Sequence, residues 1–74
     1  MNTNTRYVIQ FDGATDAMHV ASYAGADLDT RMVQSSRLGD RIVTVWDCAA
    51  ADAEALEERL DDDAAVLEYR TEAR

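Results

Sequence analysis

Apolar and polar residues alternate along several short segments of the chain, which is the pattern of strands with one buried face. Four segments show this pattern, and they are 5–11, 28–36, 41–47 and 65–71. In the first, Tyr7, Ile9 and Phe11 share one face. The third is apolar on both faces, which predicts a central place in a sheet. Polar residues 37–40 between the second and third segments indicate a hairpin.

The clearest helical pattern lies in the second half of the chain. Leu56 and Leu60 continue an apolar stripe that starts at Ala49, which predicts a helix over 49–60. Asp47 is its candidate N-cap, because a carboxylate favours the positive end of a helix. Cys48 is then expected in the first helical turn, where backbone amides can lower a thiol pKa and nearby carboxylates oppose this.

Residues 15–24 predict a shorter helix. Thr15 is its candidate N-cap, and Gly25 is suited to the position after its last residue. The pattern of residues 16–24 also fits an extended strand, so the sequence leaves these two alternatives open.

The predicted order of elements is βαββαβ. This order indicates an α+β fold of the ferredoxin-like plait type, a four-stranded antiparallel sheet with two helices on one face. We expect residues 1–74 to form a single domain with residues 1–4 disordered. A domain of this size buries only about 60–65% of its unfolded surface, and Cys48 is the only cysteine. The thin core favours a homodimer, formed through the sheet face or a sheet edge.

Charge changes this picture in two ways. The chain has a net charge of −8, contains arginine but no lysine, and has ten Asp against five Glu. This composition resembles that of proteins from extreme halophiles, especially haloarchaea, where screening in concentrated salt removes the repulsion between carboxylates. The charge is also uneven: residues 47–63 hold eight acids and one arginine, a net charge of −7, whereas residues 31–41 hold three arginines and one acid.

The segment Arg41 to Arg70 contains a strand, a helix with Leu56 and Leu60 four residues apart, an acidic turn and a second strand. It resembles part of the non-DNA-binding region of haloarchaeal regulators of the bacterio-opsin-activator type. The helix-turn-helix of those regulators has no counterpart here. The resemblance therefore implies a stand-alone sensory or interaction module without DNA binding, and it supplies no functional residues.

Four residues are candidates for contact with a ligand or partner, and they are Arg31, Arg37, Arg41 and Trp46. Arginine is suited to bidentate contact with carboxylate or phosphate. Trp46, with Tyr7 or Tyr69, would form a dimer surface or ligand platform if it lay on the helix-free face, whereas in the core it would be structural. Solvated charges on a hairpin are the alternative for the arginines.

Catalytic and metal-binding patterns are weak. His19 is the only histidine, and Asp16 and Tyr23 have the spacing to share its side of a helix. The chain has no phosphate-binding loop or nucleophile elbow, and no Cys–His spacing typical of zinc. The acids of residues 52–63 lack the alternating pattern of a calcium loop. We therefore expect no catalytic residues, no metal and no cofactor.

Three function classes remain as hypotheses. The first is a non-enzymatic protein-interaction or small-ligand-sensing module. The second is a small enzyme or enzyme subunit that uses His19 and the arginines in a cleft. The third is nucleic-acid binding through the sheet, which we rank last because the chain lacks an evident pair of exposed aromatics beside arginines. The polar start of the chain predicts no signal peptide, and the lack of a long apolar run predicts a cytoplasmic protein without a membrane partner.

Overall fold

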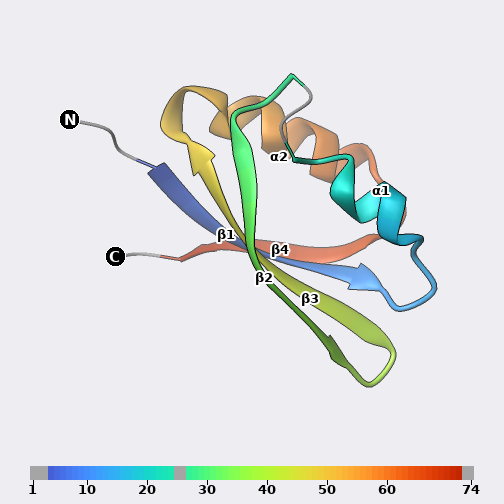
Figure 1. Ribbon diagram of the computed structural model, residues 1–74. Coiled ribbons are helices and arrows are strands. Elements are labelled where there is room, and N and C mark those ends of the chain that lie inside the picture. The colour runs from blue at the N-terminus through green and yellow to red at the C-terminus, as the bar shows by residue number, and fades with distance from the viewer. Residues whose placement is uncertain (1–3, 25–26, 73–74) are drawn as a thin grey trace.

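The computed structural model describes residues 4–24 and 27–72. The fold has four strands and two α-helices, with a 3₁₀ turn before the second helix, and Figure 1 shows how the strands and α-helices are arranged. The elements are β1 (Asn4–Asp12), α1 (Ala17–Ala21), β2 (Thr30–Leu38), β3 (Arg41–Ala49), η1 (Ala50–Asp52), α2 (Ala53–Asp62) and β4 (Val66–Glu72). Residues 1–3 of the segment that we expected to be disordered lie outside the described residues, whereas Asn4 is the first residue of β1.

The strands form one sheet in the order β2-β3-β1-β4. Each neighbouring pair is antiparallel, with β1 between β3 and β4. The predicted α+β class, four-stranded antiparallel sheet and two helices are therefore confirmed. The segment that is apolar on both faces, β3, lies inside the sheet as predicted.

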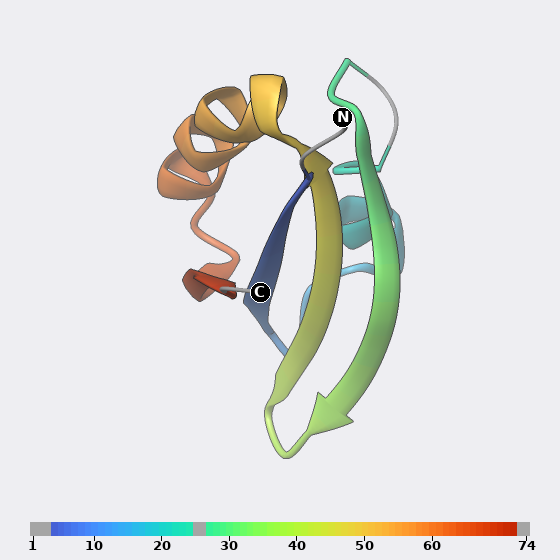
Figure 2. The same cartoon turned by 90° about the vertical axis from the view of Figure 1, so that its left-hand side faces the viewer.

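One face of the sheet carries the core. On β1, the alternating residues Tyr7, Ile9 and Phe11 are fully buried, and on β3 Trp46 and Cys48 lie on the same face. Val20 of α1 and the leucine stripe of α2, Leu56 and Leu60, complete the core against these side chains. Both helices consequently cover this face, and Figure 2 shows the turn of the β2–β3 hairpin far from α2.

The predicted start of the long helix is wrong. β3 continues to Ala49, because its residues pair with β1 as far as Asn4 and with β2 as far as Thr30. Cys48 is therefore a strand residue buried in the core rather than a residue of the first helical turn. Asp47 is not an N-cap, since its carboxylate accepts hydrogen bonds from Arg6 across the sheet.

The helix alternative for residues 16–24 is the one observed, but the helix is short. α1 covers only Ala17–Ala21. Its N-cap is Asp16, whose side chain accepts a hydrogen bond from the Met18 amide at 2.8 Å, so the predicted cap Thr15 is wrong. Gly25, which we predicted to follow the helix, lies outside the described residues.

The hairpin turn contacts the loop between β1 and α1. Gly39 in this turn has φ +63°, a conformation that glycine adopts without steric cost. The Gly13 amide donates to the Asp40 carbonyl at 2.7 Å. This contact fixes the hairpin relative to the start of α1, and so it sets the width of the space between them.

Among the described residues, no helix is long and apolar enough to cross a membrane.

Candidate functional site

The outer side of β2 is the most exposed strand edge of the molecule. β2 is nine residues long, pairs with β3 on one side only, and is exposed along most of its length. Met32, Val33 and Leu38 are large apolar residues with 38%, 45% and 63% of their surface exposed. Natural sheets usually protect such an edge with lysine, proline, a bulge or a short strand. Here the strand contains neither lysine nor proline, and its protection is one irregularity between Met32 and Gln34 together with the charges of Arg31 and Arg37. We call this outer side, Thr30–Leu38, the β2 edge.

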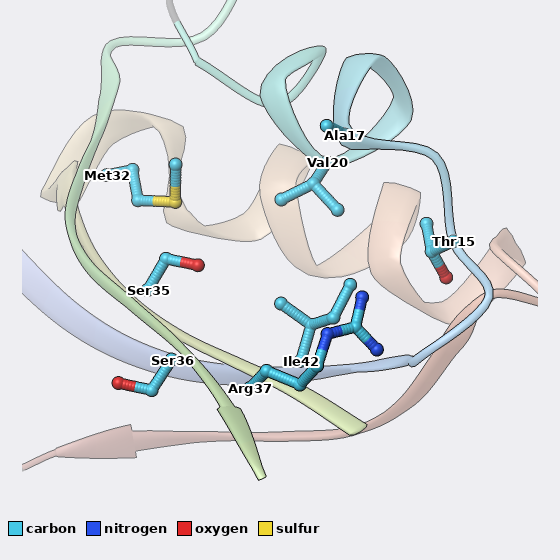
Figure 3. Close-up of a pocket in the computed structure, with 8 residues that line it drawn as sticks. All are labelled: Thr15, Ala17, Val20, Met32, Ser35, Ser36, Arg37 and Ile42. Atoms are coloured by element: carbon cyan, nitrogen blue, oxygen red, sulfur yellow. The ribbon is translucent and has the colours of Figure 1, made fainter. Parts of the chain in front are cut away.

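A groove opens between α1 and β2. Its volume is about 340 Å³, and the residues that line it are Thr15, Ala17, Val20, Met32, Ser35, Ser36, Arg37 and Ile42. In Figure 3 the side chains of Val20, Met32 and Ile42 point toward one another from three elements. These side chains form an apolar floor, and we call the whole hollow the α1–β2 groove.

Polar groups stand at one end of this groove. The guanidinium of Arg37 reaches back to the loop before α1, where Nη1 donates to the Gly13 carbonyl at 3.2 Å. Thr15, which also lines the groove, has a buried hydroxyl oxygen without a hydrogen-bond partner. A buried polar atom of this kind is unusual in native proteins, because it has lost its hydrogen bond to water. The groove therefore combines an apolar floor with a cation and an unsatisfied hydroxyl.

The three candidate arginines differ in their positions and in their partners. Arg41 lies on the sheet face away from the helices and donates to Gln10 Oε1 at 2.8 Å and to Glu68 Oε2 at 3.4 Å. Arg31 and Arg37 both belong to β2, at opposite ends of the β2 edge. Arg31 is highly exposed, with 79% of its side chain accessible. Arg41 consequently has two partners within the sheet, whereas Arg31 contacts Asp47 only at 3.8 Å and Arg37 donates to the Gly13 carbonyl.

Trp46 lies in the core. Its side chain is 1% exposed, and Nε1 donates to the Thr44 hydroxyl on the same strand. Tyr7 and Tyr69 also lie on the helix side, where their hydroxyls reach Glu57 and Asp61 of α2. The face opposite the helices, here called the open face, instead has a small patch of valines, Val8, Val43 and Val45, between charged side chains. None of the chain's aromatic residues lies on the open face, so it has no platform on which bases could stack.

His19 contacts a carboxylate far away in the sequence. Its Nε2 lies 2.6 Å from Asp63 Oδ2, the same oxygen that accepts a 2.5 Å hydrogen bond from the Tyr23 hydroxyl. Burial raises the pKa of Asp63, but hydrogen bonds from Tyr23, the Ala65 amide and His19 outweigh burial and lower this pKa overall. Burial and the hydrogen bond to Asp63 raise the pKa of Tyr23.

This cluster lines a hollow together with Arg59, whose guanidinium carbon lies 5.1 Å from the centre of the Tyr23 ring. The candidate arginines Arg31, Arg37 and Arg41 belong to β2 and β3 and do not line this hollow. Asp63 and Tyr23 have pKa values displaced away from neutrality in opposite directions, so neither is tuned for proton transfer at neutral pH. The cluster links α1 to the end of α2, which is a structural role.

The remaining candidate groups do not form a reactive site. Burial raises the pKa of the Cys48 thiol, and the charges of Asp52, Asp29 and Glu57 raise it further, so the reactive thiolate is disfavoured. In the part of the chain that the structure describes, no three His, Cys, Asp or Glu side chains are grouped as metal ligands.

Most of the α1–β2 groove was not identified from the sequence. Val20, Met32 and Ile42 have no local pattern that distinguishes them from core residues. The groove arises from the packing of a five-residue helix over a longer hairpin. No protein-family model, curated protein or solved structure matches this chain.

Proposed function

We propose that this chain is a non-enzymatic interaction module that binds an extended segment of a partner protein along the β2 edge. The observation that carries the proposal is the nine-residue unpaired edge of β2 beside the α1–β2 groove. Proteins often recognise extended peptides by adding them as a strand to an exposed sheet edge. Backbone hydrogen bonds then supply affinity, and pockets for alternate side chains supply specificity.

The α1–β2 groove is suited to be a pocket for alternate side chains of the bound segment. β2 forms one wall of it through Met32, Ser35 and Arg37. A strand paired with β2 directs every second side chain to the helix side of the sheet, next to this groove. An aliphatic side chain there would cover the apolar surface of Val20 and Met32, at about 25 cal/mol for each Å² removed from water.

The proposal also includes the fold type of the chain, the kind of organism it comes from and its regulatory role. The βαββαβ order of elements and the strand order support assignment to the ferredoxin-like plait. The absence of lysine and the net charge of −8 support a haloarchaeal, salt-rich cytoplasm. The resemblance of residues 41–70 to the non-DNA-binding region of bacterio-opsin-activator-type regulators supports a regulatory role.

A homodimer is the other occupant of this surface that the sequence predicts. The open face is a poorer site for it, because two of its arginines already have partners: Arg6 contacts Asp47 at 2.9 Å, and Arg41 contacts Glu68 at 3.4 Å. The β2 edge is therefore the better dimer surface, and a dimer and a partner segment would compete for it.

A small ligand is a second candidate function. It is favoured by the Arg37 guanidinium at the end of the groove. An amphipathic anion of modest size, such as a short-chain carboxylate, would contact this guanidinium and cover the apolar floor.

The β2 edge is testable with a pair of neutral eight-residue probe peptides of alternating valine and threonine, one of which has a central proline. Nuclear magnetic resonance titration should shift the amide signals of β2 and of Val20 with the first peptide. The proline peptide should bind at least tenfold more weakly, because proline removes a backbone donor.

Two edge variants provide the matched comparison. Val33→Lys on β2 should abolish binding, since lysine blocks strand pairing at an edge. Leu67→Lys on the other edge strand, β4, should leave it unchanged, and both residues have the same 45% exposure. Equal binding by both peptides, or loss of binding in Leu67→Lys alone, would show that the β2 edge is not the site.

A further inference from the structure

We infer that the segment bound at the β2 edge is acidic, with an aliphatic side chain between its acidic residues. This inference rests on the proposed function and adds the chemistry of the partner. It is drawn from the charge of β2, from where its two arginines point, and from the apolar floor of the α1–β2 groove.

The charge of β2 is opposite to that of the molecule. The chain carries a net charge of −8, but Thr30–Leu38 contains two arginines and no acidic residue. Arg31 Nη2 lies 3.8 Å from Asp47 Oδ2, and Asp47 is itself held by Arg6 at 2.9 Å. A contact this long, made by an arginine that is 79% exposed, contributes little. The Arg31 guanidinium therefore remains available to another carboxylate.

The positive charge of Arg37 is balanced by nearby carboxylates even less than that of Arg31. Its one hydrogen bond among the described residues goes to the Gly13 carbonyl, and none of the described carboxylates forms an ion pair with it. A guanidinium has five N–H donors in a fork that matches a carboxylate. A partner carboxylate at this end of the groove would make a charge-assisted contact that the chain itself does not supply.

The two arginines point to different faces of the sheet. Arg31 pairs across the strands with Asp47 on the open face, whereas Arg37 lines the groove on the helix side. Five residues of β2 lie between them, which places the two positions about 20 Å apart. Side chains five residues apart on a regular strand point to opposite faces. A matching segment thus needs two acids five residues apart, one directed to each face, and an aliphatic residue between them that enters the groove near Met32.

A second copy of the chain fits this surface less well than an acidic segment. Antiparallel pairing of two β2 edges would gather four arginines and no acid at one interface, and like charges on facing strands are destabilising. An extended polyanion such as single-stranded RNA would also be attracted to the arginines. It would find no aromatic side chain for its bases on the exposed surface of β2, which contains none.

The test uses three eight-residue peptides that share a central leucine and differ at two positions five apart, which hold glutamate, glutamine or lysine. Fluorescence anisotropy should be measured at the lowest salt at which the circular dichroism of the protein is unchanged. The glutamate peptide should bind at least tenfold more tightly than the glutamine peptide, and the lysine peptide should bind most weakly.

Variants of the protein with altered charge on β2 should change the order of affinity of the three peptides. With Arg31→Glu and Arg37→Glu together, the lysine peptide should bind most tightly, and with Arg31→Gln and Arg37→Gln the three peptides should become equal within about twofold. The exposed Arg70 of β4 provides the control, since Arg70→Glu has the same charge change on the other edge strand and should keep the original order.

The possible failures are distinguishable. If the three peptides bind the unmodified protein equally and still shift β2 amides, the acidic partner is excluded while the edge remains a binding site. If no peptide binds, the proposed function itself fails. A dimer by light scattering, with β2 amides protected from exchange, would assign the edge to a second copy. Tighter binding of oligouridine than of the glutamate peptide would assign it to nucleic acid.

Discussion

The indole Nε1 of Trp46 donates a hydrogen bond to the hydroxyl of Thr44, two residues earlier on β3, across 2.7 Å. The same hydroxyl donates to the Ile9 carbonyl on β1 at 2.8 Å. Thr44 is fully buried, so water cannot replace either contact. One hydroxyl therefore satisfies a buried donor and a buried acceptor in the middle of the sheet.

Thr44→Val should destabilise the protein by about 1–3 kcal/mol, because the indole N–H of Trp46 would remain buried without an acceptor. Unfolding by urea is the measurement, and Trp46 is the only tryptophan, so its fluorescence reports directly on this site. Thr71→Val, the same change at an exposed position of β4, should stay within about 0.5 kcal/mol. Equal stability of the two variants would contradict the role of the Thr44 hydroxyl.

The carboxylate of Asp63 should make folding sensitive to acid. Its pKa is lowered in the folded protein, so it adds stability above its unfolded value of about 3.9, and this stability is lost as the pH falls through the folded pKa. Asp63→Asn should lower the free energy of unfolding by about 1–3 kcal/mol at neutral pH and show a smaller further loss below about pH 4.

Urea unfolding from pH 7 to pH 2 measures both effects of Asp63. The exposed neighbour Asp62 provides the control, and Asp62→Asn should keep the acid dependence of the unmodified protein. An unchanged pH profile in Asp63→Asn would mean that the contacts with Tyr23 and His19 do not stabilise the fold.

Gly13→Ala should disrupt the contact between the hairpin turn and the loop before α1. A Cβ at this position would lie 2.5 Å from the Asp40 carbonyl oxygen and 2.8 Å from its carbon, and both are backbone atoms that cannot rotate away. We expect a loss of about 1–3 kcal/mol in unfolding free energy. Gly39→Asn should cost under about 1 kcal/mol, because no atom lies within 4 Å of a Cβ there and asparagine tolerates positive φ. Thermal unfolding of the two variants would show whether this order holds.

Cys48 should be inert to alkylation in the folded protein. Its side chain is fully buried and burial raises the pKa of its thiol, so little thiolate is present at neutral pH. Iodoacetamide should modify it only after unfolding in guanidinium. In a variant that combines Cys48→Ala with Ala50→Cys, the thiol moves to an exposed position and should react within minutes. Rapid modification of native Cys48 would indicate frequent opening of this end of β3.

The sequence predicted correctly those parts of the fold in which buried apolar residues recur at a regular spacing. The spacing of two residues in Tyr7, Ile9 and Phe11 identifies the buried face of β1. The spacing of four residues between Leu56 and Leu60 identifies the buried face of α2. The boundary between β3 and α2 was wrong since local signals favoured a helix start at Asp47. The long-range pairing of β3 with β1 extends the strand past that residue, and no local pattern records it.

The candidate site was predictable only in part. Arg31 and Arg37 were named from residue type, which suffices for exposed groups on a hairpin. That Arg41 is already bound depends on the alignment of β3, β1 and β4, which brings Gln10 and Glu68 beside it. Trp46 was open to both interpretations, because a strand that is apolar on both faces does not show which face the helices cover.

The position of α2 has a consequence for how a partner would approach. α2 contacts β4 at one edge of the sheet, and β2 forms the other edge. Negative charge is thus concentrated on the α2 side, whereas β2 itself carries two arginines and no acid, which gives the molecule an electric dipole across its strands. In dilute buffer this dipole would turn an anionic partner toward β2 before contact and speed association. In molar salt the screening length shrinks to about 3 Å. The partner would then be recognised only through direct contacts. Its affinity would depend on the geometry of the guanidinium contacts and on the fit of one aliphatic side chain.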